Sequence, residues 1–266
     1  PPRYNGGLLD QAQRDQIDVV LVSPRNPLNI GAAARAMANF GFARLTVVAP
    51  FEDHWREARS AVGAPEVLAE AREAATLPEA LAECTLAIGT GTVSARRPEQ
   101  PVAALPDLAP LVERELRKGG RIAIAFGSEK RGLTRENLSR CHLLVEIPTD
   151  ARQPSMNLGQ AVAVCLYELA TRVNLSGVDW SEASRSDGRG IRAPEESSAA
   201  RGAEIDMLAD VIAGTMEAAR YSPAAMRGAN RHDVLLLLRR LNLTSSDLKR
   251  ALGLFRRILW RLKQQP

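Results

Sequence analysis

The sequence has few residues of the kinds that build disulfide frameworks, metal centres or histidine-based active sites. Its 266 residues include three cysteines and three histidines, and aromatic residues make up 4%. Cys84, Cys141 and Cys165 are far apart and form no CxxC pattern or cysteine–histidine cluster. The sequence therefore indicates neither a disulfide framework nor a zinc site, and we expect three buried thiols and no metal.

Long apolar runs are also absent. No segment approaches the roughly 18 apolar residues that a membrane-spanning helix needs, and the first 16 residues contain no apolar stretch of the signal-peptide type. With 45% hydrophobic and 25% charged residues, the chain can bury a sizeable core. We therefore expect a cytoplasmic globular protein without a membrane partner. The net charge of +4 alone says nothing about nucleic acid.

Short β-branched runs alternate with amphipathic stretches from residue 17 to residue 175. This alternation predicts an α/β fold, in which a parallel sheet is covered by helices. The expected strands are 18–22, 45–48, 85–88, 121–126 and 143–147. The expected helices are 29–39, 78–84, 106–118 and 157–173, with a further short helix capped by Thr134.

The composition changes in the last third of the chain. Residues 176–202 are rich in Ser, Gly, Arg, Asp and Glu, which predicts a flexible linker, and residues 1–16 are expected to be a flexible N-terminus. Residues 203–266 are expected to be a small helical domain, with helices at 203–220, 230–241 and 245–262.

The later part of this helical domain is strongly basic. Between Arg227 and Lys263 it carries ten Arg or Lys residues against Asp233 and Asp247. The basic residues are Arg227, Arg231, Arg239, Arg240, Lys249, Arg250, Arg256, Arg257, Arg261 and Lys263. This excess predicts a surface that faces RNA phosphates, and a merely solvated helix face is the alternative.

Three polar loops, each of which follows an expected strand, carry the residues with chemical potential. The loops are Ser23–Arg35, Phe126–Leu133 and Ile147–Gly159. Because ligands of parallel sheets bind outside the carboxyl ends of the strands, these loops predict a ligand site. Arg35 lies one turn inside a helix that follows a strand–loop junction, where anions are favoured. Ser155 and Asn157 stand at a helix entrance, where they serve either as caps or in chemistry.

The glycines of two regions do not complete a known phosphate loop. Gly127 and Gly132 have the separation of a Walker A loop, but Leu133 stands where the essential lysine should be. The segment Gly89–Ser94 begins like a dinucleotide fingerprint and lacks its third glycine. A nucleotide hydrolase is therefore the weakest reading, although the glycines still indicate tight turns beside a ligand.

Taken together, three motifs resemble, in order and spacing, those of the SPOUT ribose methyltransferases, the TrmH-like group. The motifs are Asn29–Arg35, Phe126–Leu133, and Ile147–Pro148 followed by Ser155–Leu158. The resemblance covers residues 18–173, and residues 232–263 resemble the extension of TrmJ-type tRNA methyltransferases. It implies a SPOUT domain at 17–175 with a deep C-terminal trefoil knot, followed by a small all-helical domain. It also implies a homodimer with the methyl-donor pocket at its interface.

The implied activity is transfer of a methyl group from S-adenosylmethionine to a ribose 2′-oxygen of tRNA, at nucleotide 32 of the anticodon loop, without a metal. The resemblance implies donor binding, largely through backbone groups, at Thr90, Gly91, Thr92, Gly127, Ile147, Pro154, Ser155 and Met156. It implies catalytic roles for Arg35, Ser155 and Asn157. RNA contacts are expected at Arg96, Arg97, Lys130 and Arg131, the first two lying where this chain has extra residues compared with the TrmJ pattern.

The proton of the ribose hydroxyl needs an acceptor, because that hydroxyl is a poor nucleophile at neutral pH. His54, His142 and His232 lie outside the three loops, so a histidine base is not expected. We interpret Arg35 as a bidentate clamp on the target phosphate that also polarises the 2′-hydroxyl, with direct action as the base as the alternative. Two other functions stay open: an rRNA ribose methyltransferase, and a non-catalytic RNA-binding protein on the same fold.

Overall fold

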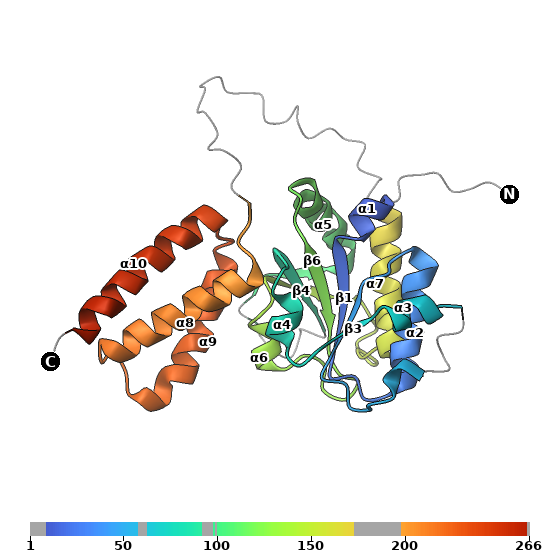
Figure 1. The fold of residues 1–266 in the computed structure, drawn as a ribbon. Helices are drawn as coiled ribbons and strands as arrows, with labels where there is room; N and C mark the ends of the chain where they lie inside the picture. Colours follow the sequence, from blue (N-terminus) through green and yellow to red (C-terminus); the bar gives the residue numbers. More distant parts are fainter. Residues whose placement is uncertain (1–8, 58–62, 92–97, 99, 173–197, 265–266) are drawn as a thin grey trace, which may run out of the picture.

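The computed structural model describes residues 9–57, 63–91, 98, 100–172 and 198–264, and its centre is one parallel sheet (Figure 1). Its strands are β1 (Ile17–Val22), β2 (Leu45–Val48), β3 (Arg72–Ala74), β4 (Leu86–Thr90), β5 (Val102–Ala104), β6 (Ile122–Phe126) and β7 (Leu143–Glu146). The strand order is β3-β2-β1-β6-β4-β7-β5, and every neighbouring pair is parallel. β7 thus lies between two strands that precede it in the chain. The predicted α/β class is confirmed, and the knot stays a prediction.

Helices cover both faces of this sheet, because its strands are apolar on both sides. In β1, Val19 and Leu21 face one core cluster while Val20 and Val22 face the other, as the two-residue period of a strand requires. The first face carries α2 (Pro27–Phe40), α5 (Leu108–Arg117) and α7 (Leu158–Arg172). The second face carries α4 (Leu77–Leu81) and α6 (Arg135–Leu138). Thr134 caps α6 as expected, accepting a hydrogen bond from the Asn137 N–H.

Helices α2 and α7 cross closely, which brings the first and third predicted motifs together (Figure 1). At the crossing a Cβ atom on Gly159 would lie 2.7 Å from the Ala32 Cβ. Small residues at both positions therefore let the two backbones approach, and a larger side chain at residue 159 would separate the helices.

The C-terminal segment forms three helices, α8 (Gly202–Ala218), α9 (Arg227–Arg240) and α10 (Ser245–Lys263). They enclose a core of their own, which contains Ile205, Leu208 and Leu235. The segment is docked onto the α/β unit, because the Gly202 N–H donates to the Cys84 carbonyl at 3.0 Å and α8 lies beside α4 (Figure 1). The docking is close, since a Cβ atom on residue 202 would lie 2.4 Å from the Leu81 carbonyl oxygen.

A charged cluster lies at this docking surface. Asp206 of α8 stands between Arg140, at 2.9 Å, and Arg239 of α9, at 3.5 Å. The Arg239 side chain is 1% exposed, and burial lowers its pKa while Asp206 opposes that shift. One carboxylate thus balances two buried cations across the boundary between the two units.

The structure differs from the sequence-based expectations at several short elements and in both segments that were expected to be flexible. Strands β3 and β5 were not predicted, and the short helices α1 (Gln11–Arg14) and α3 (Pro65–Ala69) were not either. The expected flexible N-terminus is, in its described part, a helix with a buried Leu9 beside it. Residues 176–197 of the expected linker lie outside the described residues, whereas Ala199 pairs with Thr244 in a β-bridge.

The expected burial of the three cysteines is confirmed. All three thiols are buried, and burial raises the pKa of Cys84, Cys141 and Cys165 to about 12, so they stay protonated. No helix within the described part of the chain has both the length and the apolarity to cross a bilayer.

Candidate functional site

A cavity of about 610 Å³ lies at the carboxyl ends of three adjacent strands, β4, β6 and β7, where they meet the start of α7. This is the edge at which ligands bind in open parallel sheets. The lining residues are Thr90, Gly91, Phe126, Gly127, Ser128, Glu129, Lys130, Arg131, Gly132, Ile147, Thr149, Pro154, Ser155, Met156, Leu158 and Ala161. We call this space the strand-end cavity.

The strand-end cavity gathers the positions at which the sequence predicts a methyl donor. Seven of the eight line it, from three segments that are far apart in the sequence: Thr90, Gly91, Gly127, Ile147, Pro154, Ser155 and Met156. Thr92 lies outside the described residues. The predicted RNA-contacting residues Lys130 and Arg131 line the same cavity, whereas Arg96 and Arg97 also lie outside the described part.

Two glycines of the strand-end cavity have opposite surroundings. A Cβ atom on Gly127 would lie 2.0 Å from the carbonyl carbon of Gly132, so the loop can fold back on itself only around a glycine. Gly132 closes this loop with its N–H on the Ser128 carbonyl at 2.7 Å and a positive φ of 64°. A Cβ atom on Gly91, in contrast, would meet none of the described residues within 4 Å, so Gly91 borders open space in that part of the chain.

A hydrogen-bond network joins the three predicted motifs beside the cavity. The Glu129 carboxylate of the second motif accepts the Asn29 side-chain N–H at 2.8 Å, and Asn29 in turn accepts an N–H from Asn157 at 2.9 Å. The Arg25 backbone N–H donates to the other carboxylate oxygen, Glu129 Oε2, at 2.9 Å. The Asn26 backbone N–H donates to Glu129 Oε1, the oxygen that also accepts from Asn29, at 3.1 Å. The network fixes the relative positions of three loops that meet at one edge of the sheet.

These contacts determine the charge state of Glu129. Its partial burial raises the pKa, but the hydrogen bonds from the Asn29 side chain and from the backbone of Arg25 and Asn26 outweigh burial, so that the pKa is lowered. Glu129 is therefore a fixed carboxylate whose oxygens are already used. The role of Glu129 could not be predicted from the sequence, because nothing near a glutamate in a glycine loop indicates partners about one hundred residues away.

The three predicted catalytic residues occupy different places. Asn157 caps α7, since its side-chain oxygen accepts the Gly159 N–H at 2.9 Å, and Ser155 lines the cavity. Arg35 lies on the exposed face of α2 and is not among the described residues that line the strand-end cavity. A single chain therefore brings together Ser155, Asn157 and the donor positions, but not Arg35.

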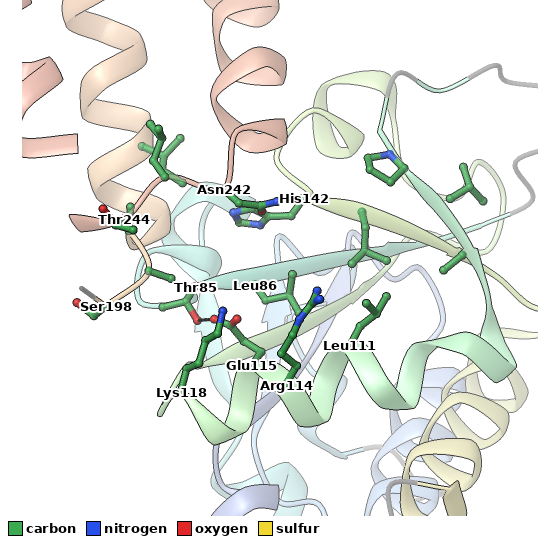
Figure 2. A pocket seen from close by; sticks show the side chains of 18 residues that line it. Thr85, Leu86, Leu111, Arg114, Glu115, Lys118, His142, Ser198, Asn242 and Thr244 are labelled. Carbon is green, nitrogen blue, oxygen red and sulfur yellow. Dashed lines mark hydrogen bonds between the residues drawn. The ribbon is translucent and has the colours of Figure 1, made fainter. Parts of the chain in front are cut away.

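A second cavity, of about 740 Å³, lies between the α/β unit and the C-terminal helices (Figure 2). Thr85, Leu86 and His142 place it at the amino ends of β4 and β7, the opposite edge of the sheet. Burial and Arg239 lower the pKa of His142 to about 3, and its Nδ1 accepts the Ala87 N–H at 2.9 Å. The Thr85 hydroxyl donates a hydrogen bond to the Glu115 carboxylate (Figure 2). This cavity has none of the residues of the three motifs, so the strand-end cavity is the candidate site.

Comparison with known proteins gives concordant matches. Residues 16–167 match the model of the SpoU rRNA methylase family. The chain is 41% identical over 156 residues to the tRNA (cytidine/uridine/adenosine-2′-O-)-methyltransferase TrmJ of Pseudomonas aeruginosa, a match that covers 58% of this chain and 60% of that protein. It is 38% identical over 177 residues to the tRNA (cytidine-2′-O-)-methyltransferase TrmJ of Methanocaldococcus jannaschii, which covers 64% of this chain and 76% of that one.

Solved structures extend the likeness to the C-terminal helices. The crystal structure of TrmJ from Z. mobilis ZM4 superposes with a TM-score of 0.74 at 25% identity, covering 91% of this chain and 98% of that chain. The match to the Pseudomonas protein, however, spans less than two thirds of its length. The family match covers the whole sheet and every loop of the strand-end cavity, and the chain therefore belongs to the SpoU rRNA methylase family.

Proposed function

We propose that this protein is an S-adenosylmethionine-dependent tRNA ribose 2′-O-methyltransferase that acts at nucleotide 32 of the anticodon loop. The observation that carries the proposal is the strand-end cavity, in which the predicted donor positions of three separate segments meet. Its relatives in Pseudomonas and Methanocaldococcus, which are named as tRNA 2′-O-methyltransferases, support the same chemistry.

The residues of the strand-end cavity fit the proposed donor. Its volume of about 610 Å³ is in the range of small-molecule sites, about 300–1,000 Å³. Ile147, Met156 and Leu158 offer an apolar wall for a purine ring, while backbone groups at strand ends offer donors and acceptors for the polar parts. Gly91 leaves open the space that a side chain there would fill.

The bound donor would supply a methyl group on a sulfonium centre, and the chain must position the ribose and handle its proton. Glu129 is the carboxylate among the described lining residues, and it is a poor base because its oxygens are occupied and its pKa is lowered. His142 lies at the other edge of the sheet. We therefore assign proton acceptance to a phosphate oxygen or water, with Arg35 as the clamp that holds the target phosphate and polarises the hydroxyl.

Arg35 requires a second chain in this proposal. It is exposed on α2 and does not line the cavity of its own chain. We propose a homodimer in which Arg35 of one chain reaches the donor cavity of the other. Two-fold symmetry would repeat this contact, so that each of the two cavities receives the arginine of the opposite chain.

The choice of tRNA over rRNA rests on the C-terminal helices. Helix α10 exposes Lys249, Arg250, Arg257 and Arg261, which offer cations to a phosphate backbone. The superposition with TrmJ from Z. mobilis includes these helices. An rRNA methyltransferase remains the second candidate, favoured by the name of the family model.

Isotope-labelled S-adenosylmethionine with total tRNA and total rRNA tests the proposal, followed by mass-spectrometric nucleoside mapping. Label in a 2′-O-methyl nucleoside at position 32 of tRNA is expected. A Gly91→Leu variant, in which the leucine fills the donor space, is the matched control and should transfer none.

Other outcomes separate the alternatives. Label in rRNA alone would keep the chemistry and overturn the tRNA assignment. Donor binding without label in any RNA would refute the assigned substrates, and absence of both binding and label would favour a non-catalytic RNA-binding protein.

A further inference from the structure

An exposed aromatic side chain, Phe51, lies at the same edge of the sheet as the proposed active site. Phe51 follows β2 and is 63% exposed, whereas Trp55, four residues later, is fully buried. The Arg25 guanidinium lies over the Phe51 ring, 4.7 Å from its centroid. The two side chains form a cation–π pair at the surface, which we call the Phe51–Arg25 pair.

The backbone holds this pair at the edge of the sheet that carries the strand-end cavity. The Phe51 N–H donates to the Pro24 carbonyl at 3.1 Å, so the segments after β1 and β2 are joined there. The Arg25 N–H donates to the Glu129 carboxylate at 2.9 Å, and Glu129 lines the cavity. The pair is therefore anchored, through one residue, to the wall of the donor site.

The chemistry of the Phe51–Arg25 pair suits a flat partner. Phe51 stays 63% exposed although the Arg25 guanidinium lies over its ring, so the pair is accessible to a further flat group. Unpaired RNA bases bind by stacking on aromatic rings and on guanidinium planes. Lys130 and Arg131, which directly follow Glu129 and line the cavity, supply positive charge for the adjoining phosphates.

We propose that the Phe51–Arg25 pair is a stacking platform for an unpaired base of the RNA substrate next to the methylated nucleotide. This inference rests on the proposed function and adds a positioning residue to it. The platform would hold the flanking base so that the target ribose enters the strand-end cavity in one orientation. It touches neither the donor nor the reacting atoms.

The test compares wild type with Phe51→Ala, Phe51→Leu and Phe51→Trp. Binding of a fluorescent decauridylate is measured by anisotropy, and methylation of tRNA transcripts is measured for KM and kcat. Alanine and leucine should each weaken RNA binding and raise KM about tenfold, the size of one stacked base, with kcat nearly unchanged. Tryptophan should restore wild-type values, because it restores a flat ring. Arg25→Lys, which keeps the charge and loses the plane, should lie between.

The remaining measurements keep this inference separable from the proposed function. S-adenosylmethionine affinity by calorimetry and the oligomeric state by light scattering should be unchanged in every variant. Wild-type RNA binding by Phe51→Ala would overturn the platform while leaving the methyltransferase intact. Leucine at wild-type affinity would indicate apolar contact without stacking, and a shift of Phe51→Ala to monomers would reassign the ring to a contact between subunits. If wild type methylates no RNA, the decauridylate binding alone still decides about the platform.

Discussion

At the scale of single residues, the two glycines of the strand-end cavity separate folding from ligand binding. Gly127→Ala should destabilise the protein by about 1–3 kcal/mol, because its Cβ atom would overlap the backbone of Gly132 at 2.0 Å. Urea unfolding measures the loss.

In Gly91→Leu, by contrast, the side chain enters open space. Its unfolding midpoint should stay near that of wild type while donor affinity in calorimetry falls by more than roughly tenfold, about 1.4 kcal/mol. Donor affinity equal to wild type in this variant would place the donor elsewhere.

Glu129 gives the site a pH dependence whose sign follows from its hydrogen bonds. Its pKa is lowered in the folded protein from the ordinary value of 4.5, so its contribution to stability is present above that value and is lost as the pH falls through the folded pKa. Glu129→Gln should be less stable than wild type at neutral pH, and the difference should shrink as the pH falls below about 4.5. Urea unfolding, measured about every half pH unit between pH 3 and pH 7, checks this prediction. A constant difference across that range would contradict it.

At the same scale, the sequence indicated which loops lie together but not the hydrogen bonds that hold them. Thr90, Gly91, Gly127 and Ile147 line one cavity, as expected of loops that follow apolar strands whose carboxyl ends meet at one edge. Their role in donor binding, which the family resemblance implies, stays a prediction. The network through Glu129 could not be predicted, since each of its bonds joins residues about one hundred positions apart.

At the scale of secondary-structure elements, the docking of the C-terminal helices depends on the cluster of Arg140, Asp206 and Arg239. Asp206→Asn would leave two buried guanidinium groups without their shared carboxylate, which should cost about 3–5 kcal/mol. Hydrogen exchange should show lost protection in α8 and α9 and retained protection in β1. Asp210→Asn is the matched control on the same helix, because the Asp210 side chain is 58% exposed and its bond to Arg231 contributes about 0–1 kcal/mol. Equal effects of the two substitutions would show that burial of the cluster adds nothing.

The same elements show which parts of the fold could be predicted. The five strands of the buried sheet centre are continuous apolar runs and were found within about two residues, whereas β3 and β5 have three residues each and exposed positions. Their strand character comes from pairing with β2 and β7, not from their own sequence. The helices of the C-terminal segment were found from the sequence. Their docking was not, because Gly202 and Asp206 act through tertiary contacts.

At the scale of the whole molecule, the position of Arg35 decides how many chains make one active site. Seven of the eight predicted donor positions line the strand-end cavity within one chain, while Arg35 is exposed on α2 and is not among the described residues that line it. Arg35→Ala should therefore bind the donor normally and transfer no methyl group, whereas Gly91→Leu should bind RNA normally and no donor. Each variant alone should be inactive.

A mixture of these two variants tests the dimer directly. If Arg35 acts across the interface, a mixed dimer has one site with an intact donor cavity and an intact arginine, and one site with neither. Random exchange makes about half of the dimers mixed, so the mixture should recover about one quarter of wild-type activity. If Arg35 acts within its own chain, each site of the mixed dimer carries one defect and no activity returns. Label transfer measured after joint refolding of equal amounts distinguishes the two arrangements, and native mass spectrometry of the mixture verifies that mixed dimers formed.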